Sequence, residues 1–184
     1  MTTILAYKDE ENSYIATESQ TTYGYESGFN HYKKIIKKGK LYIAMAGNGL
    51  ALNIIEDIWN LPKRKKLSKK HYITKVVIPS SRKAIHDYMT SRGISSKVEF
   101  GMIIVYKSEI YRVFTNSAWR RIKKHEIVSG GSGGDYAESY FNASSEKDIK
   151  KRLINSIEYA ISKDICSGGK VRLKVIPHKN KDKR

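Results

Sequence analysis

The sequence predicts an α+β protein in which helices pack outside β-sheets. Segments with a strand pattern and segments with a helical period follow one another in blocks, as strands, helices, strands, helices and a final strand. This order differs from the regular strand–helix repeat of a parallel sheet. No internal repeat or linker divides the 184 residues, so we expect one domain over residues 1–177 and a basic tail over residues 178–184.

The first third of the chain is expected to supply strands. Residues 2–8 and 14–17 are rich in β-branched and aromatic side chains, and a polar turn at residues 9–12 joins them. Apolar side chains on both faces of the first segment indicate a strand covered on two sides. Residues 21–31 are polar and contain glycines, which predicts a loop, and residues 41–46 predict a central strand that ends at Gly47.

The middle of the chain changes to a helical period. Apolar residues recur every three or four positions and predict a helix that ends before Pro62, namely Leu50, Ile54, Ile58 and Leu61. Residues 81–92 predict a second helix, closed by Gly93. Residues 98–106 and 110–114 predict two strands of a hairpin.

The last third begins at a glycine-rich run, SGGSGG, at residues 129–134. This run lies between a strand-like segment and a helix that starts at residues 135–141, so it predicts a tight functional turn rather than a flexible linker. A longer helix is expected over residues 146–161, with Ser145 and Asp148 forming a capping box at its start. Residues 170–176 alternate apolar and basic side chains and predict a final strand.

The composition fits a soluble protein of a reducing cytoplasm. The longest apolar runs reach about seven residues, too short for a membrane span, and no secretory signal opens the chain. The single cysteine, Cys166, excludes an internal disulfide. The histidines show no metal-ligand spacing, and the glycine-rich run lacks the Lys-Ser/Thr of a phosphate-binding loop. We therefore expect no metal and no cofactor.

The charge balance is strongly basic, with 35 Lys and Arg against 18 Asp and Glu, a formal net charge of +17. Residues 62–70 (PKRKKLSKK) carry six of the bases, and residues 178–184 (HKNKDKR) carry four. These segments read either as a solvated loop and a frayed end or as sites for a polyanion such as nucleic acid, bound through Lys63–Lys70. The charge alone does not identify the function.

Thr2 follows the initiator methionine directly, and methionine is normally removed when its neighbour is small. Removal of Met1 would give Thr2 a hydroxyl and a free α-amine on one residue. The α-amine has an ordinary pKa of about 7.7–8.0, which suits a general base at neutral pH, whereas a lysine amine near 10.4 is almost wholly protonated. An N-terminal threonine can thus serve as nucleophile and base together.

Several motifs resemble those of proteasome β-type subunits and the bacterial HslV peptidase. The start has Thr2-Thr3-Ile4, then Glu18, Thr22 with Gly24, and Lys34, in the order of that family. AMAGNG at residues 44–49 resembles its alanine-glycine turn, GSGGDYA at residues 131–137 its glycine-rich turn into a helix, and DICSGG at residues 164–169 its Asp-x-x-Ser-Gly-Gly element. The resemblance runs from Thr2 to about Ile176 and is poorest over residues 62–97.

The resemblance implies a four-layer αββα sandwich and a threonine-type endopeptidase that attacks with Thr2. Lys34 would stand beside the Thr2 hydroxyl as a fixed cation, with Glu18 as its ion-pair partner. The Gly47 N–H would bind the oxyanion. Three residues would support the threonine amine: Ser132, Asp164 and Ser167. Family members form stacked hexameric or heptameric rings, degrade unfolded proteins and work with an AAA+ unfoldase.

One departure leaves alternatives open. The family places aspartate where this chain has Glu18, whose carboxylate is one methylene further out. The ion pair with Lys34 can survive with a shifted carboxylate, or the site can be misaligned. The alternatives to an active peptidase are a catalytically silent ring or scaffold protein of the same fold, and a basic adaptor for nucleic acid.

Overall fold

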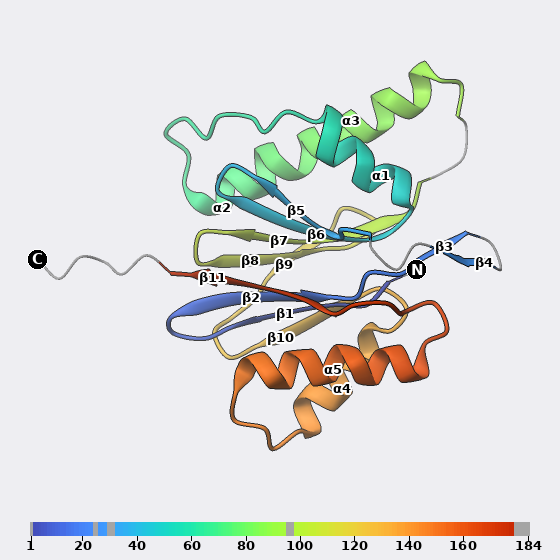
Figure 1. Ribbon diagram of the computed structural model, residues 1–184. Helices are drawn as coiled ribbons and strands as arrows, with labels where there is room; N and C mark the ends of the chain where they lie inside the picture. Colours follow the sequence, from blue (N-terminus) through green and yellow to red (C-terminus); the bar gives the residue numbers. More distant parts are fainter. Residues whose placement is uncertain (1, 24–25, 29–31, 95–97, 179–184) are drawn as a thin grey trace, which may run out of the picture.

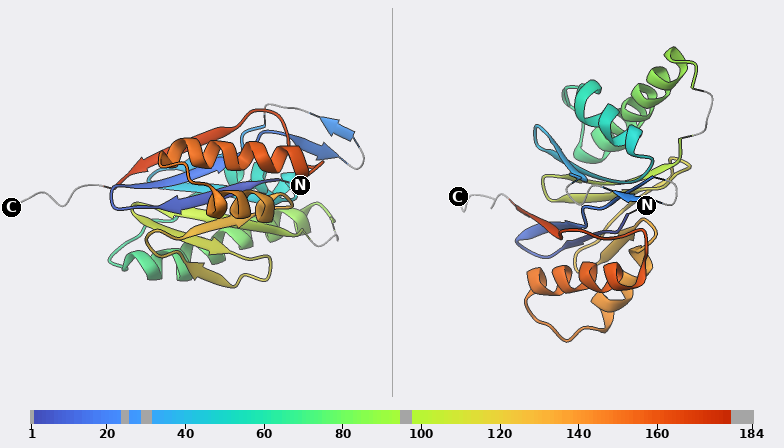
Figure 2. Two further views of the ribbon diagram at one scale, coloured as in Figure 1. Left: turned by 90° about the horizontal axis from the view of Figure 1, so that it is seen from below. Right: turned by 45° about the vertical axis from the view of Figure 1, so that its right-hand side comes forward.

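The chain folds into four layers, helices–sheet–sheet–helices, in a computed structural model that describes residues 2–23, 26–28, 32–94 and 98–178 (Figures 1 and 2). The first sheet has the order β10-β1-β2-β11, with every pair antiparallel. Its strands are β1 (Ile4–Lys8), β2 (Asn12–Thr17), β10 (Ile127–Gly130) and β11 (Arg172–Pro177). The predicted αββα architecture is confirmed.

The second sheet has the order β5-β6-β7-β8-β9 and is also antiparallel throughout. Its strands are β5 (Ile35–Lys38), β6 (Leu41–Gly47), β7 (Phe100–Tyr106), β8 (Glu109–Val113) and β9 (Trp119–Arg121). The predicted hairpin is formed by β7 and β8, with Lys107 in a left-handed turn conformation at φ 58°.

The core between the sheets explains the pattern of the first strand. Ile4 and Ala6 of β1 pack against the second sheet, where they meet Ile103 and Val105. Leu5, next along β1, turns to the opposite face and packs against the helices below. Successive side chains of a strand point to opposite faces, so β1 is covered on both sides, as its apolar composition predicts.

Two groups of helices cover the outer faces. The first sheet is covered by α4 (Gly134–Ala143) and α5 (Ile149–Lys163). The second sheet is covered by α1 (Gly49–Asn53), the π-helical turn η1 (Ile54–Ile58), α2 (Lys69–Tyr72), the π-helical turn η2 (Ile73–Val77) and α3 (Ile78–Ser91). No helix in the described parts of the chain is both long and apolar enough to cross a membrane.

Two helix boundaries differ from the prediction. The first helix ends at Ile58 rather than Leu61, because Trp59 takes an extended conformation and its ring is buried in the core. The second helix begins at Lys69 rather than residue 81, since α2, η2 and α3 run on without a break. Pro79 does not interrupt this run, since it is the second residue of α3 and follows the wider π turns of η2. Gly93 closes the helix at φ 64°, as predicted.

Other local predictions need correction. The segment at residues 21–31, predicted as a loop, contains the short antiparallel strands β3 (Thr21–Tyr23) and β4 (Glu26–Gly28), while Gly24 lies outside the described residues. Asp148 is itself the N-cap of α5 and accepts from the Lys150 N–H at 2.8 Å, so no capping box starts at Ser145. Strands β5 and β9 lacked a clear sequence pattern because they are short, whereas β10 is the strand-like segment expected before the glycine-rich run.

The final strand alternates exposed basic and half-buried apolar side chains, as predicted. His178, the first residue of the predicted tail, is held against the first hairpin, because its backbone N–H donates to Glu11 O at 2.6 Å. Residues 179–184 of that tail lie outside the described residues.

Candidate active site

A pocket of about 290 Å³ is lined by residues next to the start of β1 and the end of β6. The start of β1 and the end of β6 lie at the same end of the sandwich (Figure 1). Three residues from distant parts of the sequence line the pocket together: Thr2 before β1, Lys34 before β5, and Gly47 at the last position of β6. Thr2 is 4% exposed. The antiparallel course of β1 and β6 along the two facing sheets brings these chain segments to one end.

Behind the pocket, Glu18 and Lys34 form a buried ion pair. Glu18 is 0% exposed and Lys34 is 3% exposed. The Oε1 atom of Glu18 that pairs with Lys34 also accepts from the Thr3 N–H at 3.1 Å. One carboxylate oxygen therefore holds the Lys34 ammonium group beside the peptide that follows Thr2.

The second oxygen of Glu18 fixes the carboxylate in place. It accepts from the Gln20 N–H at 2.6 Å and more weakly from the Gly168 N–H at 3.4 Å. The longer side chain of Glu18 thus keeps both the ion pair with Lys34 and a backbone anchor on each side. The sequence left open whether a glutamate here would keep the ion pair with Lys34 or misalign the site, and the structure shows that the ion pair is kept.

The pKa of Lys34 is lowered from the ordinary lysine value. Burial of the ammonium group is the largest cause, and the negative charge of Glu18 acts in the opposite direction. The negative charge of Asp164 acts in the same direction as that of Glu18, so two carboxylates oppose the effect of burial on Lys34.

A second network is built around Asp164, which follows α5. Its Oδ2 accepts from Ser132 Oγ at 2.6 Å and from Ser167 Oγ at 2.7 Å, and its Oδ1 accepts from the Cys166 N–H at 3.1 Å. Burial acts to raise the pKa of Asp164, but these hydrogen bonds outweigh it, and the pKa lies below the ordinary aspartate value.

This network reaches the start of β1 through Thr3. Thr3 Oγ1 lies 2.6 Å from Ser167 Oγ. Because the Ser167 proton is donated to Asp164, the Thr3 hydroxyl is the donor in this contact. The chain Thr3–Ser167–Asp164–Ser132 therefore ties the residue after Thr2 to the turn before α4 and to the loop after α5.

Glycines in the turn between β10 and α4 let it approach the threonines. Gly131 has φ +87°, and a Cβ atom there would lie 1.8 Å from the carbonyl oxygen of Thr2. A Cβ atom at Gly133 would lie 2.0 Å from Thr3 Oγ1. Only glycine fits at either position, so the glycine-rich run is a tight turn packed on the chain start, as predicted.

Gly47 is constrained in the same way from the opposite sheet. It has φ +118°, and a Cβ atom would lie 2.3 Å from Glu99 O of the neighbouring segment. The residue is exposed toward the pocket. The backbone of Gly47 is thus accessible from the pocket.

The structure places the predicted residues in two groups. Thr2, Lys34 and Gly47 line the pocket, and Glu18 lies behind Lys34. The remaining three form the network that meets Thr3, namely Ser132, Asp164 and Ser167. Cys166 is buried beside them, as its small size suggested.

Sequence reasoning did not predict three pocket residues, namely Gln20, Tyr32 and Asn53, or the contact between Thr3 and Ser167. Tyr32 donates from its hydroxyl group to Asn53 Oδ1, and both residues line the pocket with Gln20. No local pattern marks these residues, because their contact joins segments twenty-one positions apart. Thr3 had a signal, the repeated threonine of the start motif, but no role was assigned to it.

Comparison with solved structures gives a clear likeness. The BPH protein (bacterial proteasome homologue) of Thiobacillus denitrificans matches with TM-score 0.78 and 18% identity over 97% of this chain and 99% of that one. The same protein solved in complex with epoxomicin matches with TM-score 0.76 and 19% identity over 95% and 98% of the chains. HslV of Trypanosoma brucei matches with TM-score 0.69 and 18% identity over 96% and 99%.

Sequence comparison adds nothing to this likeness: no family profile matches the chain, and no curated protein matches it. The structural matches cover nearly the whole chain at low identity and define its fold. That fold is the αββα sandwich that BPH and HslV share. In particular, the chain has the architecture of proteasome β-type subunits and HslV.

Proposed function

We propose that the protein is a threonine-type endopeptidase that cleaves peptide bonds with Thr2 after removal of Met1. The observation that carries the proposal is the pocket shared by Thr2, Lys34 and Gly47, with the buried Glu18–Lys34 pair directly behind it. The retained ion pair favours an active site over the catalytically silent alternative. The fold shared with BPH and HslV supports the same reading.

The proposed chemistry uses two groups of one residue. The Thr2 hydroxyl attacks the scissile carbonyl carbon, and its proton passes to the α-amine of Thr2. The Lys34 cation lowers the pKa of the hydroxyl and, by repulsion between like charges, favours the neutral form of the amine. The protonated α-amine then gives its proton to the leaving nitrogen as the peptide bond breaks, which leaves an ester on Thr2. Water hydrolyses this ester, releases the carboxylic acid and restores the Thr2 hydroxyl.

The surrounding residues have supporting roles in this proposal. The Gly47 N–H donates to the oxyanion of the tetrahedral intermediate, a contact worth about 3–4 kcal/mol in comparable sites. The Asp164 network holds the start of β1 through Thr3. A carboxylate with a lowered pKa is charged at neutral pH, so Asp164 also favours the protonated amine that forms during attack.

Assembly and partners are part of the same proposal. We infer that copies of the chain associate into stacked hexameric or heptameric rings in the cytoplasm and take unfolded protein from an AAA+ unfoldase. The motifs shared with HslV and the match to the HslV structure over 96% of this chain support this inference.

Two substitutions at one position test the proposal. Thr2→Ala removes the hydroxyl and should lower hydrolysis of fluorogenic peptides by more than about a thousandfold. Thr2→Ser keeps a hydroxyl and an amine and should retain measurable activity. Both side chains are small, so Met1 is removed in each variant, which N-terminal mass spectrometry verifies. Full hydrolysis by purified Thr2→Ala protein would contradict the mechanism.

A further inference from the structure

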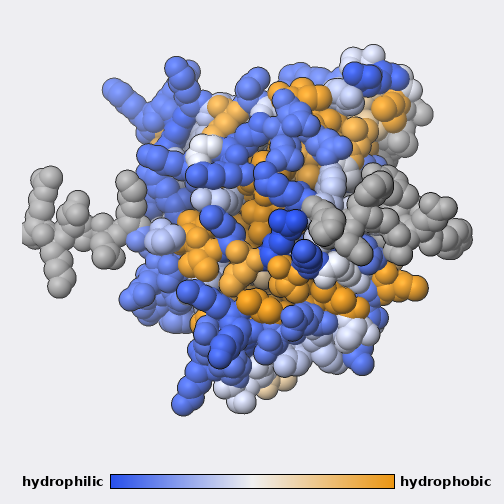
Figure 3. Space-filling model, in the orientation of Figure 1, coloured by the Kyte–Doolittle hydropathy of each residue, from blue (hydrophilic) through white to orange (hydrophobic). Residues whose placement is uncertain are grey.

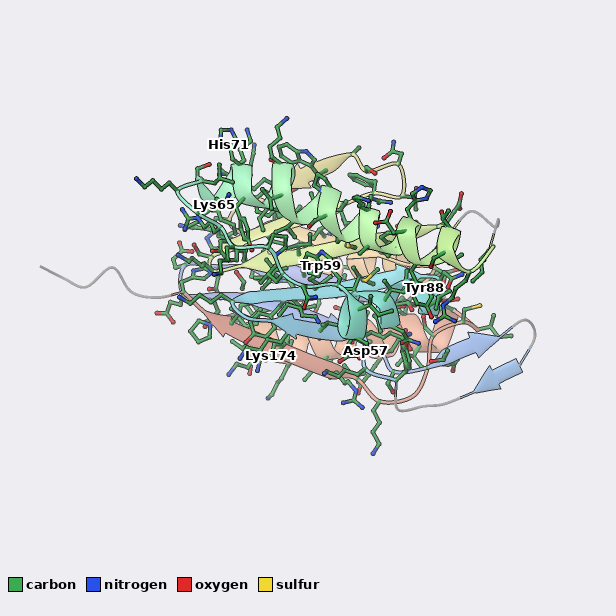
Figure 4. The ribbon with its side chains drawn as sticks, turned by 90° about the horizontal axis from the view of Figure 1, so that it is seen from above. Asp57, Trp59, Lys65, His71, Tyr88 and Lys174 are labelled. Carbon is green, nitrogen blue, oxygen red and sulfur yellow. The ribbon has the colours of Figure 1, made fainter. Side chains whose placement is uncertain are left out.

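The end of the sandwich opposite the Thr2 pocket carries a dense group of basic side chains, which we name the basic end. They come from the β5–β6 turn, from the segment between η1 and α3, and from the β7–β8 turn: Lys38, Lys40, Lys63, Arg64, Lys65, Lys66, Lys69, Lys70 and Lys107. Hydrophilic side chains gather at this end in the space-filling view (Figure 3). Lys65 and His71 mark it in Figure 4.

Contacts between the three segments bring these cations onto one surface. Lys69 Nζ donates to Ser108 Oγ at 3.4 Å, which joins the start of α2 to the β7–β8 turn. Gly39 of the β5–β6 turn packs against Leu61, since a Cβ atom there would lie 3.5 Å from Leu61 Cδ2. Lys70 Nζ lies 5.5 Å from the ring centroid of Trp119 at β9.

The basic segment is held in one conformation. Arg64 Nε donates to Leu67 O at 2.7 Å, and the Tyr72 hydroxyl donates to Pro62 O at 2.6 Å. Leu61 and Leu67 pack against the hydrophobic core. The segment is a loop with exposed lysines on a backbone that is anchored at both ends, so an anion that binds it costs little ordering entropy for the protein.

None of the cations of the basic end forms an ion pair with a carboxylate of the described residues. Nearby bases differ, since Arg121 pairs with Glu109 and Lys124 pairs with Glu10. Adjacent like charges repel one another and raise the local potential. A bound polyanion would relieve this repulsion.

We propose that the basic end binds the phosphate backbone of nucleic acid. Protein interfaces need a cluster of buried apolar anchors, whereas Trp119, an exposed large apolar side chain next to this end, lies beneath the Lys70 ammonium group. Lysine predominates here, and its ammonium group acts as a point charge rather than a bidentate reader of bases. The binding is therefore independent of sequence and steeply dependent on salt.

This site is separate from the peptidase site. Strand β6 runs from Leu41 at the basic end to Gly47 at the pocket, about 20 Å at 3.4 Å per residue. That length is about twice the screening length at 0.1 M salt. Nucleic acid bound at the basic end therefore leaves the Thr2 pocket open, and the binding holds whether or not the peptidase proposal is correct.

Two double variants with equal charge test the proposal. Lys63→Glu with Lys66→Glu alters exposed residues of the basic end, and Lys150→Glu with Lys151→Glu alters exposed residues of α5 on the opposite layer. Each pair removes two positive and adds two negative charges, so the net charge falls from +17 to +13 in both. Binding of fluorescein-labelled duplex DNA is followed by anisotropy across a series of salt concentrations, with single-stranded RNA and inorganic polyphosphate as competitors.

The wild-type protein should bind duplex DNA at low salt, and the basic-end variant should bind at least about tenfold more weakly, with a salt slope shallower by about two. The α5 variant should stay within about twofold of wild type. An unchanged thermal midpoint shows that both variants are folded. No binding by wild type at low salt, equal loss in the two variants, or binding of polyphosphate or an acidic protein without binding of nucleic acid would overturn the proposal.

Discussion

At the residue scale, the site depends on one buried cation with one buried partner. Lys34 and Glu18 are both nearly inaccessible to water, and their ion pair is anchored by the Thr3 and Gln20 amides. Burying two charges costs several kcal/mol for each, so the pair contributes little to stability. The proposed role in catalysis would explain why the chain contains a buried ion pair that contributes little to stability.

Glu18→Gln should destabilise the protein by about 3–5 kcal/mol, because it leaves the Lys34 ammonium group buried without a charged partner. The measurement is urea unfolding followed by circular dichroism. Asp87→Asn serves as the control, since it breaks the exposed Lys83–Asp87 pair and should cost less than about 1 kcal/mol. A loss as small for Glu18→Gln as for Asp87→Asn would argue against a buried charged pair.

Asp164 should make stability depend on pH in the acid range. Its pKa is lowered in the folded state, so its contribution is complete above the unfolded aspartate pKa of about 3.9 and is lost as the pH falls through the lower folded value. Asp164→Asn removes this contribution at every pH. The difference in unfolding free energy between wild type and Asp164→Asn, measured by urea unfolding, should narrow as the pH drops from about 6 to about 3. A constant difference would contradict this assignment.

At the element scale, the turn between β10 and α4 positions the chain start. Gly131→Ala should destabilise the protein by more than the roughly 1–2 kcal/mol cost of a left-handed alanine, because the added methyl group meets the Thr2 carbonyl oxygen. The rate of peptide hydrolysis by the Gly131→Ala variant should fall together with its stability. Gly93→Ala is the matched control, with φ +64° and nothing within 4 Å of the added Cβ atom. Equal unfolding free energies for the two variants would show that the turn does not press on Thr2.

The elements that the sequence predicted are those with a strong local period or a buried composition. Strand β1, strand β6, the β7–β8 hairpin and the α5 helix follow from their own residues. The helix from Lys69 to Ser91 was predicted too short, because six bases and Pro79 mask its start. Strands β5 and β9 are stabilised by their neighbours in the second sheet and carry little signal of their own.

The candidate site was predictable where its residues lie in short motifs. The resemblance proposed Thr2, Glu18, Lys34 and Gly47, and these residues lie together at one end of the structure. The Thr3–Ser167 hydrogen bond joins residues 164 positions apart. This hydrogen bond forms because the two sheets and α5 pack together, and no local sequence pattern predicts that packing.

At the scale of the whole molecule, the two proposed functions lie at opposite ends of one sandwich. The pocket lies at the end where β1 begins, and the basic end lies where the β5–β6 and β7–β8 turns gather (Figures 1 and 3). A net charge of +17 also means that copies of the chain repel one another. Assembly into the proposed rings must overcome that repulsion.

Added salt should therefore favour assembly. Raising the ionic strength from about 0.01 M to about 0.1 M shortens the screening length from about 30 Å to about 10 Å and weakens the repulsion between copies. Sedimentation velocity should show a larger fraction of ring-sized particles at the higher salt. A steep fall in that fraction would mean that attractive charge pairs, rather than screened like charges, hold the copies together.

The most direct test of the account is the site of reaction with epoxomicin, the compound with which the BPH protein was solved. An epoxyketone offers two electrophilic carbons that an amine and a hydroxyl group on one residue can both attack. Peptide mapping by mass spectrometry should find Met1 absent and the adduct on Thr2, with no adduct in Thr2→Ala. A retained Met1 with no adduct, or an adduct on any other residue, would contradict the claim that Thr2 is the nucleophile.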